Sequence, residues 1–202
     1  MCTDERQWLV KHFELSHSLE VAFTKRLIES DILNNSAWSH RYYTLFGNGA
    51  TGEEKGEELV DSEVEFAKNI IRRLSSNAAP WNYLRGCPSP CHAESNCSVL
   101  KKAKRPLSTI ESFALEFAPG NPEDRLVQAT EGIQIDDPPE AELDAAEVPT
   151  VSVHAMDVLA EIYAEKNPKQ AKQLLQELAV KYDTLRKGYW QFRMEKLGQV
   201  AA

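Results

Sequence analysis

Three cysteines and a histidine within eleven residues are the first side chains in this sequence that could bind a metal. The segment runs Cys87-Pro-Ser-Pro-Cys91-His92-Ala-Glu-Ser-Asn-Cys97, and thiolates and imidazoles are ligands that zinc prefers. The spacing is unfavourable, because gaps of three and five residues replace the tight Cys-x-x-Cys pairs of zinc knuckles, and His92 adjoins Cys91. We therefore expect a Pro-rich loop with incidental thiols and no metal site.

A second pattern combines asparagine, tryptophan and basic residues, and it repeats at an offset of 43 residues. Asn34-Asn-Ser-Ala-Trp38-Ser-His40-Arg41-Tyr42-Tyr43 matches Asn77-Ala-Ala-Pro-Trp81-Asn82-Tyr83-Leu84-Arg85. Arg6-Gln7-Trp8 aligns with Arg41-Tyr42-Tyr43 as a damaged copy, in which Thr3 takes the place of the tryptophan. An asparagine can cap a helix, and a tryptophan one turn later can bury its ring against the preceding helix. We expect the two tryptophans to anchor successive units, and each repeat arginine to pair with a neighbouring hairpin.

Helices must position these residues, because apolar side chains recur at helical spacing near both ends of the chain. Asn167 before Pro168 and Asp183 before Thr184 are expected N-caps. Nothing alternates convincingly with a period of two, so the sequence predicts an all-α fold. The expected buried stripes are Leu19, Ala22, Phe23 and Leu27; Val60, Val64, Ala67, Ile71 and Leu74; Ala155, Leu159 and Ile162; Ala171, Leu174, Leu175, Leu178 and Tyr182; and Leu185, Tyr189 and Phe192.

Composition limits the class of protein. The 202 residues are 42% hydrophobic and 27% charged, which is sufficient for a globular core. No apolar run approaches the roughly 18 residues that a membrane span needs. The polar start Met1-Cys-Thr-Asp-Glu-Arg6 does not resemble a signal peptide, so we expect a cytoplasmic protein. The 23 basic and 31 acidic residues give a net charge of −8, which argues against nucleic acid as a partner.

The chain divides into three parts by pattern. Residues 1–117 contain the helical-hairpin repeats, a Cys/Pro-rich loop at 87–106, and a further helix from Leu107 to Phe117. Residues 118–150 form an acidic, Pro-rich insertion that we expect to lack stable structure, because it contains too little apolar surface to offset the entropy of ordering. Residues 151–202 form C-terminal helices that complete the fold.

Six motifs occur in order along the chain. They are Arg6-Gln-Trp8; Asn34-Asn-Ser-Ala-Trp38 with Arg41-Tyr42; Glu63-Val-Glu65-Phe66-Ala67; Trp81-Asn-Tyr-Leu84 with Gly86; Asp157-Val-Leu-Ala-Glu-Ile-Tyr163; and Leu185-Arg-Lys-Gly-Tyr-Trp190. This ordered set resembles the α subunit shared by protein farnesyltransferase and type I geranylgeranyltransferase. The related Rab-type α subunit is less similar.

The resemblance implies a crescent, a right-handed superhelix of antiparallel helical hairpins, that wraps around a β subunit. The complex would attach farnesyl or geranylgeranyl to the cysteine of C-terminal Cys-a-a-X motifs, with zinc held only by the β subunit and magnesium assisting the farnesyl reaction. Partners would be the β subunit, Cys-a-a-X proteins and an isoprenoid diphosphate.

The same resemblance implies that this chain has no catalytic residue and no metal site. The lysine and tyrosine that the family brings to the diphosphate and the peptide belong to a hairpin before Met1, so the sequence looks like a C-terminal portion of an α subunit. We expect it to be inactive alone and to act as a scaffold. The candidate anchors and partner contacts are Arg6, Trp8, Asn34, Trp38, His40, Arg41, Tyr42, Asn77, Trp81, Asn82 and Tyr83.

A non-enzymatic scaffold of tetratricopeptide type is the alternative, because it also stacks helix pairs and binds peptides. Its units keep close to 34 residues, whereas the offsets here are about 35 and 43 with tryptophan as the anchor. The period therefore favours the prenyltransferase-type repeat.

Overall fold

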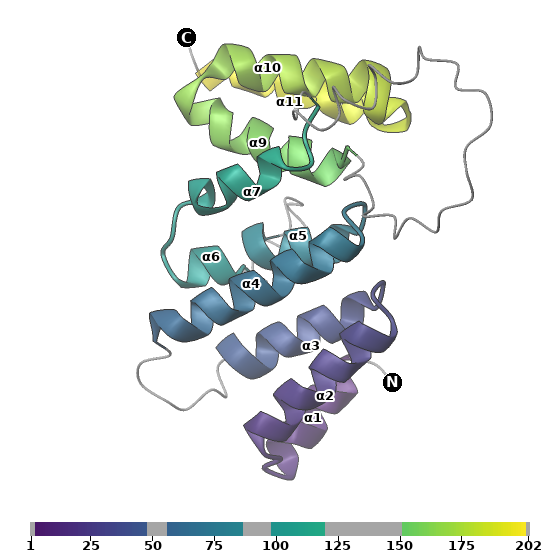
Figure 1. The fold of residues 1–202 in the computed structure, drawn as a ribbon, viewed down its shortest axis with the longest axis vertical. Helices are drawn as coiled ribbons and strands as arrows, with labels where there is room; N and C mark the ends of the chain where they lie inside the picture. The colour runs from purple at the N-terminus through teal and green to yellow at the C-terminus, as the bar shows by residue number, and fades with distance from the viewer. Residues whose placement is uncertain (1–2, 48–55, 87–97, 120–150, 201–202) are drawn as a thin grey trace, which may run out of the picture. The chain divides into compact units, whose positions relative to one another are not determined.

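The computed structural model describes residues 3–47, 56–86, 98–119 and 151–200, and all regular structure in these ranges is helical (Figure 1). The chain separates into two compact units, unit 1 (Met1–Thr109) and unit 2 (Ile110–Ala202). The prediction of an all-α fold is confirmed. No helix in the described ranges is long and apolar enough to cross a membrane.

Unit 1 consists of helices that pair across short turns. In chain order they are α1 (Thr3–His12), α2 (His17–Ser30), α3 (Asn35–Phe46), α4 (Glu57–Arg73), α5 (Ala78–Arg85) and α6 (Val99–Lys102). The helix α2 packs on α3, and α4 packs on α5, so these pairs are the two hairpins of the repeat. The helices α1, α3 and α5 also pack side by side, since α1 contacts α3 and α3 contacts α5.

The same local chemistry closes both hairpins. The Oδ1 atom of Asn34 accepts a hydrogen bond from the Ala37 N–H at 3.1 Å, and Oδ1 of Asn77 accepts from the Ala79 N–H at 3.0 Å. Each asparagine thus satisfies a backbone donor that a helix start leaves free, which confirms the predicted caps. Nδ2 of Asn77 also donates to the Ile32 carbonyl at 2.6 Å, so this cap joins the second hairpin to the turn of the first.

The buried sides of α2 and α4, the first helices of the two hairpins, were predicted with different success. The α4 stripe is confirmed, with Val60, Val64, Ala67 and Ile71 buried and Leu74 half-buried. The α2 stripe was only partly right, because Phe23 and Leu27 are half-buried but Leu19 and Ala22 are exposed. The fully buried residues of α2 are Glu20, Thr24 and Ile28. Two of these three are polar, so apolar periodicity alone placed the buried face of α2 off its true centre.

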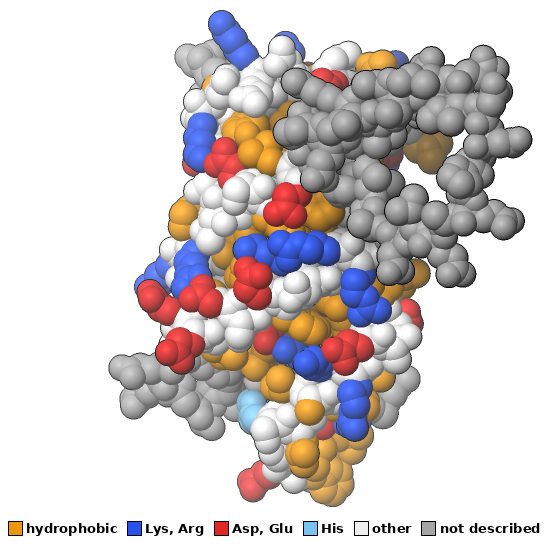
Figure 2. Space-filling view, in the orientation of Figure 1, with side chains coloured by type: hydrophobic (Ala, Val, Ile, Leu, Met, Phe, Trp, Pro, Cys, Tyr) orange, Lys and Arg blue, Asp and Glu red, His pale blue; other side chains and the backbone are white. Residues whose placement is uncertain are grey.

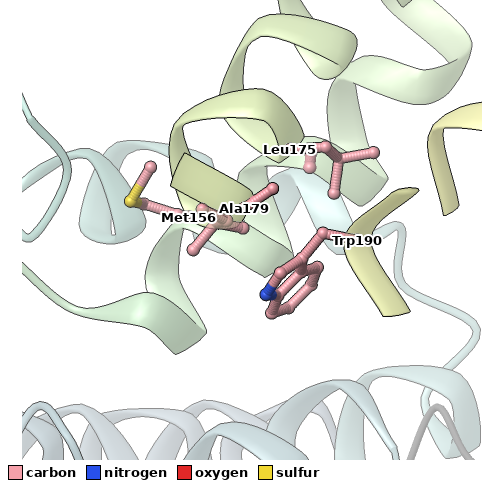
Figure 3. Packing of buried hydrophobic residues seen from close by; sticks show 6 residues of the cluster. Met156, Leu175, Ala179 and Trp190 are labelled. Carbon is pink, nitrogen blue, oxygen red and sulfur yellow. The ribbon is translucent and has the colours of Figure 1, made fainter. Parts of the chain in front are cut away.

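Unit 2 is built on a second kind of helix pairing. It contains α7 (Glu111–Leu115), α9 (Val153–Lys166), α10 (Pro168–Glu177), the π-helical turn η3 (Leu178–Tyr182), the 3₁₀ turn η4 (Thr184–Arg186) and α11 (Lys187–Val200). Met156, Leu175, Ala179 and Trp190 from α9, α10, η3 and α11 meet in its core (Figure 3). The predicted stripes of α9 and α10 are confirmed, and Asn167 caps α10 ahead of Pro168.

The predicted face of α11 was wrong. Leu185, Tyr189 and Phe192 are exposed, and Trp190 is the buried anchor, with Met194 and Leu197 packed beside it. Asp183 is likewise not a side-chain cap. Its Oδ2 instead accepts hydrogen bonds from Arg186 Nε at 2.5 Å and from the Trp190 indole N–H at 3.0 Å.

The middle of the chain also differs from expectation. Within the expected Cys/Pro loop, Val99–Lys102 forms the short helix α6. The expected helix from Leu107 to Phe117 is a 3₁₀ turn, η2 (Leu107–Ile110), followed by α7, and α7 contacts α9 of unit 2. Ala118, the first residue of the expected insertion, is buried. Pro119 is half-buried, and residues 120–150 of the insertion, like Cys87, Cys91, His92 and Cys97, lie outside the described residues.

Candidate functional site

Unit 1 has a group of buried polar side chains around a glutamate of α2. Glu20 is buried, and its Oε1 and Oε2 accept hydrogen bonds from Nη2 and Nε of Arg6 in α1, at 2.7 and 2.9 Å. Nε2 of His40 in α3 lies 2.9 Å from Oε2 of Glu20. An ionised carboxylate only accepts, so the geometry fits a histidine with its proton on Nε2. Glu20 thus joins three helices.

A glutamate of α4 repeats this arrangement. Glu63 is buried and accepts from Nη2 and Nε of Arg41 at 2.6 and 2.7 Å, which is a bidentate pair. The hydroxyl of Tyr83 in α5 donates to Oε2 of Glu63 at 2.7 Å. Nη1 of Arg41 also donates to the Val21 carbonyl of α2 at 3.1 Å. Arg41 therefore bridges one hairpin to the next.

The two sites correspond atom for atom. Glu20 and Glu63, like His40 and Tyr83, are 43 residues apart. In both sites Nε bonds Oε2, Nη2 bonds Oε1, and the third donor also reaches Oε2. Phe23 and Phe66, at the same offset, lie under the guanidinium groups of Arg6 and Arg41 at 3.7 and 4.4 Å. We call each set, Arg6–Glu20–His40 and Arg41–Glu63–Tyr83, a triad.

Electrostatics keep the triads in the charge state that the hydrogen bonds require. Burial by itself would raise the pKa of Glu20, but the hydrogen bonds and charges of Arg6 and His40 outweigh it and hold the pKa below its ordinary value. Burial and the nearby Glu63 carboxylate raise the pKa of Tyr83 well above its ordinary value. Burial would lower the pKa of Arg41, but Glu63 raises it overall. Tyr83 therefore remains a donor, and Arg41 remains charged.

The two repeat tryptophans are buried beside the triads. The Trp81 indole N–H donates to the Ser75 carbonyl at 3.0 Å. The carbonyl at the equivalent place in the first hairpin, that of Ile32, accepts from Asn77 instead, and the Trp38 indole N–H has no hydrogen-bond partner. The Trp38 ring lies 5.6 Å from Phe66 and 4.9 Å from Tyr83, so its aromatic neighbours belong to the following hairpin.

The remaining candidates separate into buried and accessible positions. His40 and Arg41 are buried and paired inside unit 1, which favours a packing role over a partner contact. Tyr42 and Asn82 are half-buried. Trp8 is 59% exposed and stacks on His12 with ring centroids 4.5 Å apart. The accessible candidates for a partner are therefore Trp8, Tyr42 and Asn82.

Glu20 and Phe23 are the triad residues that sequence reasoning missed. Applying the 43-residue offset to the Glu63 motif would have found both, since it leads from Glu63 to Glu20 and from Phe66 to Phe23. The chemistry they provide is structural, because a carboxylate with three donors is not free to act as a base. The described residues contain no group of three or more His, Cys, Asp or Glu side chains that could hold a metal ion.

Known proteins with similar sequences contain the same kind of repeat as unit 1. The family pattern described as "Protein prenyltransferase alpha subunit repeat" matches residues 18–47, which cover all but the first residue of the α2–α3 hairpin. The protein farnesyltransferase/geranylgeranyltransferase type-1 subunit alpha of Candida albicans is 26% identical over 196 residues, or 96% of this chain and 51% of the relative. The proteins of the same name from Dictyostelium discoideum and Pisum sativum are 37% and 36% identical over 67 residues, or 33% of this chain and 20% of each relative.

A solved structure matches over the same extent. It is described as Candida albicans protein geranylgeranyltransferase-I complexed with GGPP, and it aligns with a TM-score of 0.69 and 25% identity. The alignment covers 96% of this chain and 52% of that chain.

Capped hairpins, each with a buried tryptophan and a buried carboxylate, define a helical-hairpin repeat protein. More narrowly, the chain is similar in sequence and fold, over nearly its whole length, to protein farnesyltransferase and geranylgeranyltransferase type-1 α subunits. It spans about half the length of the Candida albicans relative.

Proposed function

We propose that this chain forms part of the α subunit of a heterodimeric protein prenyltransferase, which attaches farnesyl or geranylgeranyl to the cysteine of C-terminal Cys-a-a-X motifs. The observation that carries the proposal is the structural match over 96% of the chain at a TM-score of 0.69. The sequence match to the Candida albicans α subunit over the same share of the chain supports it. The tetratricopeptide alternative is not favoured, because the equivalent positions of the α2–α3 and α4–α5 hairpins keep an offset of 43 residues.

The role of this chain within such an enzyme would be to support a β subunit. Its buried ionisable groups in unit 1 hold helices together, as the two triads do. Trp8, Tyr42 and Asn82 are the accessible repeat positions from which a β contact would be built. The isolated chain would then have no prenyltransferase activity, and adding a β subunit to it would restore little or none.

The proposed metal cofactors belong to the complete enzyme and not to this chain. Zinc would belong to the β subunit, and magnesium would neutralise diphosphate charge in the farnesyl reaction. This chain's own residues would position helices and hold no metal. A cytoplasmic location completes the proposal and rests on the composition of the chain.

Co-expression with a prenyltransferase β subunit tests the proposal. We expect a co-purifying complex, with the isolated chain showing no transfer of farnesyl or geranylgeranyl to a Cys-a-a-X peptide in the presence of magnesium. A matched pair of variants, Trp8→Ala and Leu185→Ala, compares an exposed repeat position with an exposed position outside the repeat. No complex with either a farnesyltransferase or a geranylgeranyltransferase β subunit would contradict the assignment, and turnover by the chain alone would contradict the scaffold role.

A further inference from the structure

The helix α11 is apolar on two opposite sides, although only one of them is packed. Trp190, Met194 and Leu197 face the core of unit 2. Leu185, the middle residue of η4, is 98% exposed, and Tyr189 and Phe192 of α11 are also exposed. A spacing of four and then three residues puts these three side chains on one stripe. We call Leu185, Tyr189 and Phe192 the outer stripe. A helix that is apolar on both sides is normally covered on both, so we expect another segment to cover the outer stripe.

The outer stripe carries positive charge that is not neutralised by the described residues. Nζ of Lys196 lies 4.8 Å from the Phe192 ring centroid, and Lys196 has no carboxylate partner in the described part of the chain. From Leu178 to Val200 the chain has five basic and two acidic residues, whereas its overall net charge is −8. The surface therefore suits an acidic segment that also offers apolar side chains.

The sequence of this chain contains one segment of that kind. Residues 126–148 include seven acidic and no basic residues. Apolar side chains are interspersed among these acids, namely Leu126, Val127, Ile133, Ile135, Leu143 and Val148. The segment lies outside the described residues, so its charge and length are the properties that bear on the argument.

Both ends of this segment are attached to unit 2. The Ser152 N–H donates to the Phe117 carbonyl at 2.9 Å, which brings together the residues on either side of positions 120–150. A chain of this length has a root-mean-square span of roughly 30 Å, and a helix of 14 residues such as α11 is about 21 Å long. Tethering at both ends also gives a high effective concentration, so weak contacts suffice.

We propose that residues 126–148 dock on the outer stripe of α11, with their carboxylates facing Lys196 and their aliphatic side chains covering Leu185, Tyr189 and Phe192. The contact shields an apolar surface within the same chain. It rests on charge and connectivity in unit 2 and is independent of the proposed function.

Photo-crosslinking in the full-length chain tests the contact. p-Benzoylphenylalanine is placed at Phe192, and in a control variant at Gln173, an exposed position of α10. We expect crosslinks from position 192 to peptides within 126–148 in the monomer, at several times the yield from position 173. The yield should fall several-fold between about 0.05 and 0.5 M NaCl, because salt screens exposed charges.

Charge exchange makes the test specific. Lys196→Glu should lower the crosslink yield several-fold, and combining it with Glu140→Lys, Glu142→Lys and Asp144→Lys should restore it. Circular dichroism of each variant verifies that the helices are intact. Crosslinks to a second copy that increase with protein concentration would overturn the proposal, as would equal yields from positions 192 and 173.

Discussion

A single hydrogen bond distinguishes the environments of the two repeat tryptophans. The indole N–H of Trp81 has the Ser75 carbonyl as acceptor, whereas the indole N–H of Trp38 is buried without one. An unsatisfied buried donor costs about 1–3 kcal/mol. The same side chain at equivalent places therefore carries different polar contributions to the stability of unit 1.

Substitution by phenylalanine should reveal this difference. Trp38→Phe and Trp81→Phe remove similar apolar area, but only the second breaks a hydrogen bond, the one from the indole N–H to the Ser75 carbonyl. We expect Trp81→Phe to lower the free energy of unfolding by about 1–2 kcal/mol more than Trp38→Phe. Urea unfolding of both variants measures it. Equal losses would show that the indole N–H contributes nothing at position 81.

Acidification should remove the contribution of Glu20. Its folded-state pKa is below the ordinary value of 4.5, so the ionised carboxylate stabilises the fold above about pH 4.5, and this contribution is lost as the pH falls through the folded pKa. The stability difference between the wild type and Glu20→Gln should therefore shrink from about pH 5.5 to about pH 3. Urea unfolding across this range measures it, with Glu29→Gln on the exposed side of α2 as the control. A difference that stays constant would contradict the prediction.

The residues that sequence reasoning placed well are those whose role is local. Asn34 and Asn77 act within their own helix starts, so spacing alone identified them as caps. Glu20 acts through Arg6 and His40, which are 14 and 20 residues away. A polar residue on a buried face has no hydrophobic signal, and only the comparison of one repeat with the next could have located it.

Among the elements, α11 shows how a helix with two apolar sides defeats prediction from periodicity. Leu185, Tyr189 and Phe192 form as regular a stripe as Trp190, Met194 and Leu197, and tertiary packing selects the second. The deciding contacts come from Met156, Leu175 and Leu178, on segments preceding α11 in the chain. Helix existence was therefore predictable, whereas helix rotation was not.

Two alanine substitutions should separate the two sides of α11. Trp190→Ala empties a core position and should cost about 3–5 kcal/mol. Leu185→Ala removes only surface contacts, including those with the docked segment, and should cost several-fold less, no more than about 1 kcal/mol. Thermal or urea unfolding of the two variants is the measurement. Comparable destabilisation by both variants would show that the face predicted from the sequence, that of Leu185, is also buried.

For the whole molecule, the exposed apolar surface of α1 and α2 is the feature that bears on self-association. Trp8, Phe13, Leu15 and Leu19 are exposed, and Figure 2 shows hydrophobic side chains gathered at the lower end of the view, over these helices. On α4, the positions equivalent to Leu15, Leu19 and Ala22 are Glu58, Ser62 and Glu65. The repeat itself therefore does not require apolar residues there.

We expect the purified chain to self-associate as its concentration rises, because exposed apolar patches favour association. Leu19→Ser, which introduces the residue of the equivalent α4 position, should shift the association to several-fold higher concentration without loss of helix content. Sedimentation velocity over a concentration series measures the shift, and Ser62→Ala is the control. A chain that sediments as a monomer throughout the series would contradict this prediction.

The triads also show that the same helix pairing accompanies connections of different length within this chain. Arg6 and Glu20 are 14 residues apart, and Arg41 and Glu63 are 22 apart, yet the same atoms pair in both. Most of the additional residues fall in the connection between α3 and α4, which spans residues 47–56 against 13–16 between α1 and α2, and α4 also extends about one turn farther before its glutamate than α2 does. The pairing of α1 with α2, and of α3 with α4, is thus specified by side chains inside the helices and tolerates a change in the length of the segment that joins them.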